Sequence, residues 1–157
     1  MKYTRLSKEQ FQSLHPEFSQ FLAAQSIDKH QWKAIKSDQP ELTNELLDVF
    51  SDMVWDRSLE QITYLESRSD HHLFLFKCEV DRIDLILIRL SKDCPSLMRE
   101  DYRAWLGNNL SDPRVSIYQS NRIFEDTIKM EKFKLMEQGA YVSDGKSYED
   151  LKSFLSK

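Results

Sequence analysis

The 157-residue sequence predicts an α+β fold, a small and mostly antiparallel three- to four-stranded sheet packed by about six helices. Apolar residues before about position 66 recur at the spacing of helices. Two strand-like segments then follow, separated by two polar residues, and shorter mixed elements come after them. Regular alternation of strands with helices is absent, so a parallel, doubly wound sheet is not expected.

The first helical region begins at Ser7. Ser7 and Gln10 have the spacing of a capping box, in which each side chain binds the backbone N–H of the other residue. Pro16 interrupts the apolar pattern, so we expect a kink or two short helices. The residues of that pattern are Phe11, Leu14, Phe18, Phe21 and Leu22.

A second helix start lies at Asp28, which forms a capping box with Gln31. Ile27 and Trp32 occupy the two positions of a hydrophobic staple across this start. We expect the helix to run to about Ile35.

The longest helix is predicted over residues 40–66. Asp38 can cap it, Pro40 suits a first turn, and Glu41 favours the positive end of the helix dipole. Its apolar face consists of Leu42, Leu46, Val49, Phe50, Met53 and Val54. Residues 67–70 break the pattern.

An antiparallel hairpin is predicted at about 72–90, because two segments rich in strand formers flank Asp81 and Arg82. The second segment is apolar on nearly every residue through Leu85–Ile88. This pattern predicts a central strand that is covered on both faces.

Shorter elements complete the fold. We expect a short helix ending near Gly107, a third strand at about 114–119, and a helix over residues 125–138. Residues 140–142 could form an edge strand, and a final helix begins near Ser147.

Composition supports one globular domain over residues 1–157. Nine Phe, six Tyr and three Trp supply enough apolar area for a core. Only three glycines are present, which argues against a P-loop or a dinucleotide-binding fingerprint. The net charge of −4 gives no general attraction to nucleic acid or to acidic lipid.

The start of the chain shows no signal-peptide pattern, and the apolar stretch at Leu85–Ile88 is far shorter than a membrane helix. We therefore expect a cytoplasmic protein without a membrane segment. The sequence does not indicate the oligomeric state.

The most unusual feature is a row of acids along one side of the predicted long helix. Spacings of three and four residues place the six acids within about a third of the circumference. Trp55 and Leu59 fall among them, and apolar groups rimmed by charge are typical of interaction surfaces. The acids are Glu41, Glu45, Asp48, Asp52, Asp56 and Glu60.

Three interpretations of this row stay open. It can be a solvated face, or a face that bonds to Lys and Arg of the same chain. It can bind a partner protein with a basic surface, through Asp48, Asp52, Trp55, Asp56 and Leu59. It can also hold Mg²⁺ in a hydrolase, as in helical nucleotide pyrophosphohydrolases, although no second helix supplies matching acids.

The cysteines and histidines do not indicate a catalytic or metal site. Cys78 and Cys94 have no base within reach, because His71 and His72 lie about 20 Å from Cys78 along an extended strand. No His and Cys spacing resembles a zinc site. We expect structural thiols, no metal and no cofactor.

A weak single-stranded nucleic-acid binder is a further alternative, based on residues 114–134. Tyr118, Phe124 and Phe133 are interleaved with five basic residues there, and bases could stack on these aromatic rings. Three acids dilute the positive charge. We therefore favour a simpler interpretation, in which the region is a charged surface that covers buried aromatic side chains. The basic residues are Arg114, Arg122, Lys129, Lys132 and Lys134.

Five segments together resemble an uncharacterised family of small bacterial proteins, known only as a domain of unknown function. The segments are 2–11, 21–27, 47–55, 73–77 and 132–140. The resemblance implies a bacterial, cytoplasmic, single-domain protein and no particular activity. The residues themselves favour a non-catalytic protein-interaction or regulatory module that uses the acidic row.

Overall fold

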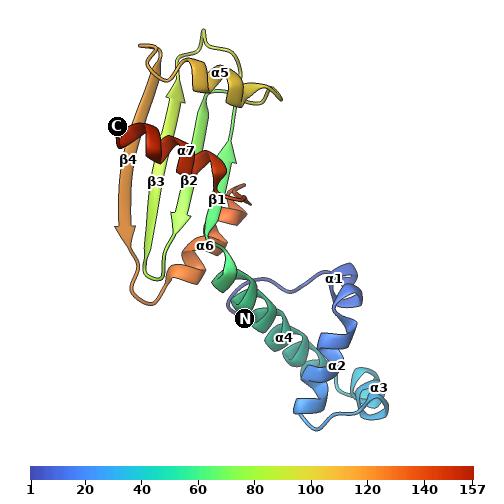
Figure 1. The fold of residues 1–157 in the computed structure, drawn as a ribbon. Helices are drawn as coiled ribbons and strands as arrows, with labels where there is room; N and C mark the ends of the chain where they lie inside the picture. The colour runs from blue at the N-terminus through green and yellow to red at the C-terminus, as the bar shows by residue number, and fades with distance from the viewer. The chain divides into compact units, whose positions relative to one another are not determined.

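A computed structural model describes residues 1–157, which divide into two compact units, Met1–Glu60 and Gln61–Lys157. The first unit is helical, and the second contains a five-stranded antiparallel sheet with three helices (Figure 1). The predicted α+β class is confirmed, with seven helices and five strands instead of about six and three to four. The single domain over 1–157 stays a prediction.

The helical unit follows the predicted start signals. Ser7 and Asp28 each form a capping box with the residue three positions later. Pro16 lies in the first turn of a second helix, so the pattern that it interrupts forms two short helices. The helices are α1 (Lys8–Ser13), α2 (His15–Ala24), α3 (Lys29–Asp38) and α4 (Pro40–Gln61).

An aromatic core holds these helices together. Phe50 of α4 is fully buried, and its ring lies 4.9 Å from the ring of Phe18 and 5.4 Å from that of Phe21, centroid to centroid. Leu6, which precedes α1, is buried in the same cluster. The segment before the first helix is therefore anchored to this core.

The predicted end of the long helix is wrong. α4 ends at Gln61, and residues Tyr64–Arg68 form strand β1 instead of helix. Leu65 pairs with Phe76 of the neighbouring strand, and Tyr64 pairs with Lys77. Strand formation here depends on that partner, which lies a dozen residues away in sequence, so the helical pattern did not reveal it.

The sheet has the strand order β4-β3-β2-β1-β5, and all neighbours are antiparallel. The hairpin predicted at 72–90 is confirmed as β2 and β3. The third predicted strand is confirmed as β4, which is longer than expected. The remaining bounds are β2 (His72–Cys78), β3 (Arg82–Leu90), β4 (Val115–Ile123) and β5 (Tyr141–Val142).

Helices cover the two faces of the sheet unequally. α5 (Tyr102–Asn108) and α7 (Lys146–Leu155) lie across one face (Figure 1), where Ile86 and Ile88 are fully buried. The opposite face packs against α6 (Ile128–Glu137) in a smaller cluster.

Full coverage of β3 on both faces is therefore not observed. β3 lies inside the sheet, between β4 and β2, but Leu85 and Leu87 are only half-buried. They point to the face opposite Ile86 and Ile88, because side chains alternate along a strand.

Candidate functional site

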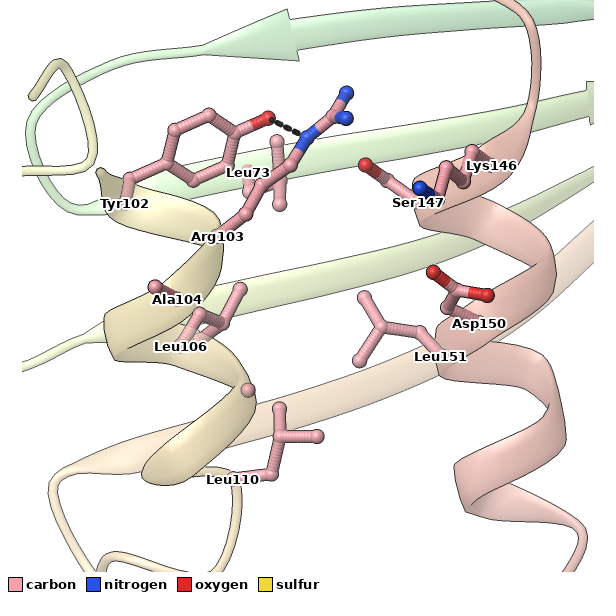
Figure 2. A pocket seen from close by; sticks show the side chains of 11 residues that line it. Leu73, Tyr102, Arg103, Ala104, Leu106, Leu110, Lys146, Ser147, Asp150 and Leu151 are labelled. Carbon is pink, nitrogen blue, oxygen red and sulfur yellow. Dashed lines mark hydrogen bonds between the residues drawn. The ribbon is translucent and has the colours of Figure 1, made fainter. Parts of the chain in front are cut away.

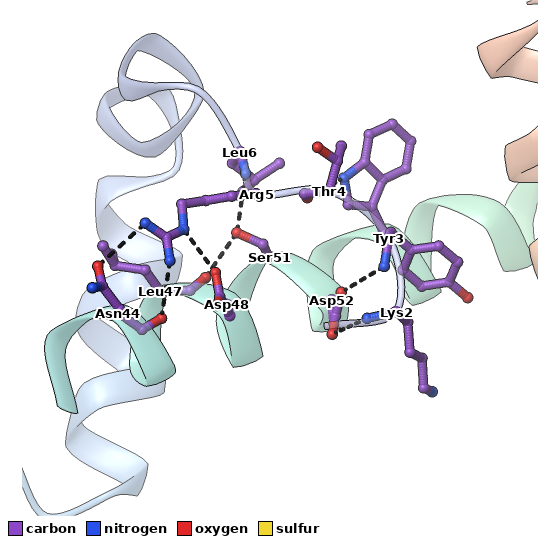
Figure 3. A network of polar contacts seen from close by, with 11 residues as sticks. Lys2, Tyr3, Thr4, Arg5, Leu6, Asn44, Leu47, Asp48, Ser51 and Asp52 are labelled. Atoms are coloured by element: carbon purple, nitrogen blue, oxygen red, sulfur yellow. Dashed lines mark hydrogen bonds and ion pairs between the residues drawn. The ribbon is translucent and has the colours of Figure 1, made fainter. Parts of the chain in front are cut away.

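The acidic row of α4 binds the start of its own chain. Residues Lys2–Leu6 run along the helix without regular secondary structure and bend at Tyr3, and Figure 3 shows their contacts with Asp48, Ser51 and Asp52. We call Lys2–Leu6 the N-terminal segment. We call the side of α4 that carries Asp48, Asp52, Trp55 and Asp56 the acidic face.

Asp52 binds the backbone of the N-terminal segment. Its two carboxylate oxygens accept hydrogen bonds from the backbone N–H groups of Lys2, at 2.8 Å, and Tyr3, at 3.0 Å. Asp56 binds side chains of the same two residues, accepting from the Tyr3 hydroxyl at 2.6 Å and from the Lys2 ammonium at 3.3 Å.

Asp48 binds Arg5, whose Nε donates to the carboxylate at 2.7 Å. Between these anchors, the indole N–H of Trp55 donates to the carbonyl of Thr4 at 3.1 Å. The backbone N–H of Leu6 donates to the hydroxyl of Ser51, which is fully buried. Main-chain and side-chain groups of the segment are thus both bound.

The spacing of two of the acids matches the advance of the bound segment. Asp52 and Asp48 are four residues apart, about 6 Å along the helix axis. Their ligands Tyr3 and Arg5 are two residues apart, about 6.6 Å in a strand-like backbone. Asp56 adds no further step, because it binds the side chains of Lys2 and Tyr3, the same residues whose backbone Asp52 binds.

The hydrogen bonds between the N-terminal segment and the acidic face shift the pKa values of Asp48 and Tyr3. The hydrogen bond from Arg5 lowers the pKa of the Asp48 carboxyl below its usual value. Burial, followed by the hydrogen bond to Asp56, raises the pKa of the Tyr3 hydroxyl, so Tyr3 stays protonated and donates at neutral pH. The acids therefore carry charge that the same chain largely compensates.

Most of the predicted interaction residues lie together on this face. Asp48, Asp52, Trp55 and Asp56 are half-buried along one side of α4. Leu59 is different, because it is fully buried and cannot add apolar area to an exposed surface. The sequence pattern placed Leu59 among the acids on the helix but gave no sign of its burial. Partner binding by the other four residues stays a prediction.

A second polar site lies on the sheet unit, in a cleft of about 480 Å³ that includes Glu66 and Arg68 of β1. Glu66 is only 3% exposed, and neither its Oε1 nor the Nε of Arg68 has a hydrogen-bond partner. The Arg68 guanidinium instead lies 4.1 Å from the centre of the Tyr102 ring. A buried polar atom without a hydrogen bond is costly, so Glu66 Oε1 and Arg68 Nε are unusual features of the fold.

The sequence interpretation missed this cleft because it assigned residues 62–66 to a helix. A strand would place Glu66 and Arg68 on the same face, since they are two residues apart. Tyr141 of β5 lies opposite Glu66 in the sheet. Burial and the charge of Glu66 raise the pKa of the Tyr141 hydroxyl.

An apolar pocket of about 330 Å³ lies between α5 and α7, which face each other across it in Figure 2. Leu106 and Leu110 line it on one side and Leu151 on the other, while Arg103 and Asp150 contribute polar groups. The Arg103 Nε donates to the Tyr102 hydroxyl at 3.2 Å. The pocket can accommodate an apolar group but brings no catalytic pair together.

The two thiols are buried and unpaired. Burial raises the pKa of Cys78 to about 11, so little thiolate forms at neutral pH. No group of three or more His, Cys, Asp or Glu side chains lies close enough together to hold a metal ion. No helix is long and apolar enough to cross a membrane.

The basic residues of 114–134 are largely engaged within the chain. Arg114 binds Asp112 at 2.9 Å, and Lys134 binds Glu131 at 3.5 Å. Lys132 is buried and donates to the carbonyl of Ile62. The region does not form a continuous basic surface.

Comparison with known proteins gives a family but no activity. No curated protein and no solved structure matches the chain. A family model described as a family of unknown function (DUF6495) matches residues 1–156. The chain therefore belongs to this family of unknown function, which confirms the resemblance identified from its sequence segments.

Proposed function

We propose that this protein is a non-catalytic protein-interaction module whose acidic face binds a basic, non-helical segment of a partner protein. The observation that supports this proposal is the way in which the face binds Lys2–Leu6. The proposal takes the partner to be a bacterial, cytoplasmic protein, as the family resemblance implies.

The contacts define what the partner segment must offer. Asp52 needs two successive backbone N–H groups that point to the same side, which a bend such as that at Tyr3 supplies, and neither residue can be proline. Asp48 takes an arginine, and Asp56 takes a lysine or a tyrosine hydroxyl. The proposed ligand is therefore a non-helical segment that bends at Asp52 and carries a basic or tyrosine residue two or three positions before an arginine.

The N-terminal segment is a competitor for the same face. Its ion pairs are partly exposed, with 39% of the Arg5 side chain and 64% of the Lys2 side chain accessible. Such pairs each contribute up to about 1 kcal/mol, so a partner segment can displace them. Binding would then be an exchange of one basic segment for another.

A labelled peptide with the sequence of residues 1–7 tests the exchange by fluorescence anisotropy. The Arg5→Glu variant, which weakens the internal competitor, should bind the peptide several-fold more tightly than the unchanged protein. Adding Asp52→Asn to that variant should abolish the gain. Glu17→Gln is the matched control, because Glu17 is an exposed acid on α2, and it should have no effect.

Sequence order separates recognition from bulk charge. A peptide of the same composition in scrambled order keeps the charge but loses the match between arginine and Asp48. Equal binding of both peptides, or no gain in the Arg5→Glu variant, would contradict the proposal.

The Mg²⁺-dependent hydrolase stays an alternative prediction for the same acids. Asp48 and Asp52 each bind the N-terminal segment, so a cation would have to replace Arg5 or backbone N–H groups. Titration calorimetry with Mg²⁺ decides: saturable binding that is lost in Asp48→Asn and Asp52→Asn would favour the hydrolase over the interaction module.

Single-stranded nucleic-acid binding by residues 114–134 also stays a prediction. Its test is RNA or DNA binding over a range of salt concentrations, because neutralised phosphates give a steep salt dependence. Arg114 and Lys134 form ion pairs within the chain, which leaves less charge to neutralise phosphates. We therefore expect the affinity for nucleic acid to change little with salt concentration.

A further inference from the structure

The two edges of the sheet differ in length and protection. β5 forms one edge and has only two residues, whereas β4 forms the other and has nine. Natural edge strands usually carry proline, lysine or a bulge that prevents pairing with another chain. β4 contains neither proline nor lysine, and its residues from Tyr118 to Ile123 are all exposed.

The register shows which backbone groups of β4 point outward. The Arg114 carbonyl accepts from the N–H of Ser91, and the Phe124 N–H donates to the carbonyl of Asp81. Both contacts lead to the β3 side, and in an antiparallel pair alternate residues bond to the same neighbour. Even-numbered residues therefore bond to β3, and odd-numbered residues point their N–H and C=O groups away from the sheet.

Four residues of β4 present these unpaired groups: Ile117, Gln119, Asn121 and Ile123. Val115 points the same way, but its N–H already donates to the carbonyl of Asp112. The outward edge is thus a series of four donors and four acceptors in one strand whose pairing with β3 has no bulge.

We propose that β4 pairs antiparallel with β4 of a second copy of this chain, about a twofold axis at Ser120. In this register Ile117 lies opposite Ile123, and Gln119 lies opposite Asn121. All four outward residues of each copy are then paired. The pairing adds about eight backbone hydrogen bonds and joins the two sheets edge to edge.

The side chains match in this register. Ile123, which is 66% exposed, gains the apolar side chain of Ile117 from the other copy. The amides of Gln119 and Asn121 face each other. On the other face of the sheet, Ser120 meets Ser120, and Tyr118 lies opposite Arg122.

Charge complementarity favours the same register. Arg122 is the only charged residue within β4, and a guanidinium opposite a tyrosine ring is an attractive cation–π pair. Moving the axis to Arg122 would place two guanidinium groups opposite each other. Moving it to Gln119 would place Ile117 opposite Asn121. A second copy with its axis at Ser120 is therefore the occupant that this edge fits best.

Disulfide trapping of the full chain tests the register. Two Ser120→Cys side chains would face each other in a non-hydrogen-bonded pair with Cα atoms about 4.5 Å apart, within disulfide range. In the same register, each Tyr118 lies opposite Arg122 of the other copy. Two Tyr118→Cys side chains would therefore be offset by four residues, about 13 Å along the strands, although they lie on the same face of the sheet as Ser120. The buried Cys78 and Cys94 give the same background in both variants.

We expect the Ser120→Cys variant to form the crosslinked dimer at least about tenfold faster than the Tyr118→Cys variant, since only the former meets disulfide geometry. Sedimentation of the unchanged protein should show a dimer fraction that rises with concentration, and Ile123→Lys should reduce it. A monomer at every concentration, or equal crosslinking of both cysteine variants, would overturn the proposal. The sedimentation result stands even if a cysteine variant fails to fold.

Discussion

The acidic face of the helical unit and the β4 edge of the sheet unit are both rows of polar groups, but only the groups of the acidic face already have partners within the chain. On the acidic face, Asp48 and Asp52 already bind the N-terminal segment. On β4, the outward backbone groups of Ile117 to Ile123 bind nothing else in the chain. A partner must displace an existing ligand at the first surface, whereas it only has to add to the second.

This difference has a measurable meaning. A partner should bind the acidic face more tightly when the N-terminal segment is weakened as a competitor. Pairing at the β4 edge has no internal competitor, so the dimer fraction should depend on the protein concentration. The buried polar side chains of the two units also differ. Ser51 of the helical unit is hydrogen-bonded, whereas Oε1 of Glu66 in the sheet unit has no hydrogen-bond partner.

The largest expected effect is the loss of core packing in one unit at a time. Phe50→Ala and Leu75→Ala each remove a fully buried side chain. We expect the free energy of unfolding to fall by about 3–5 kcal/mol for Phe50→Ala and by about 2–5 kcal/mol for Leu75→Ala. If the units unfold independently, Phe50→Ala should leave the labelling rate of Cys78 and Cys94 unchanged, because both thiols lie in the sheet unit.

Thiol labelling followed by mass spectrometry measures this directly. Leu75→Ala is the positive control and should speed the labelling of both cysteines. Equal acceleration by both variants would instead support the single domain predicted from the sequence.

A smaller effect is expected at Glu66. Glu66→Gln removes a buried charge whose Oε1 has no partner, so the free energy of unfolding should rise by about 1 kcal/mol or more. Urea denaturation measures the change, with Glu100→Gln as an exposed control in the same cleft. A clear loss of stability would show that attraction to nearby arginines outweighs the missing hydrogen bond.

The smallest effect concerns exposed carboxylates. Arg5 lowers the pKa of Asp48, and Arg114 lowers the pKa of Asp112 to about 2. A depressed pKa stabilises the folded state above the usual aspartate pKa, and the contribution is lost as the pH falls through the folded-state value. NMR titration should show that Arg5→Ala returns Asp48 to its usual range and leaves Asp112 unchanged. An unchanged Asp48 would contradict the ion pair.

Local signals in the sequence predicted much of the fold. The capping boxes at Ser7 and Asp28 and the hairpin at 72–90 depend on residues a few positions apart, which a pattern can reveal. β1 was missed because its strand conformation depends on pairing with β2. The buried state of Leu59 was missed for a similar reason, since tertiary packing and not helical periodicity determines it.

The candidate site shows the same limit. The acidic row was visible in the sequence, together with the alternative that it bonds to basic residues of the same chain. Its ligand was not visible, because Arg5 and Asp48 are 43 residues apart. Glu66 and the outward residues of β4 become notable only when the register of the sheet is known.

Amide hydrogen exchange of the N-terminal segment tests exchange at the acidic face most directly. The N–H groups of Tyr3 and Leu6 are bound by Asp52 and Ser51, so they should be protected in the protein alone. Saturation with a basic peptide of the same sequence as residues 1–7 should abolish that protection while the amides of Phe50 stay protected. Peptide binding that leaves Tyr3 and Leu6 protected would contradict the account.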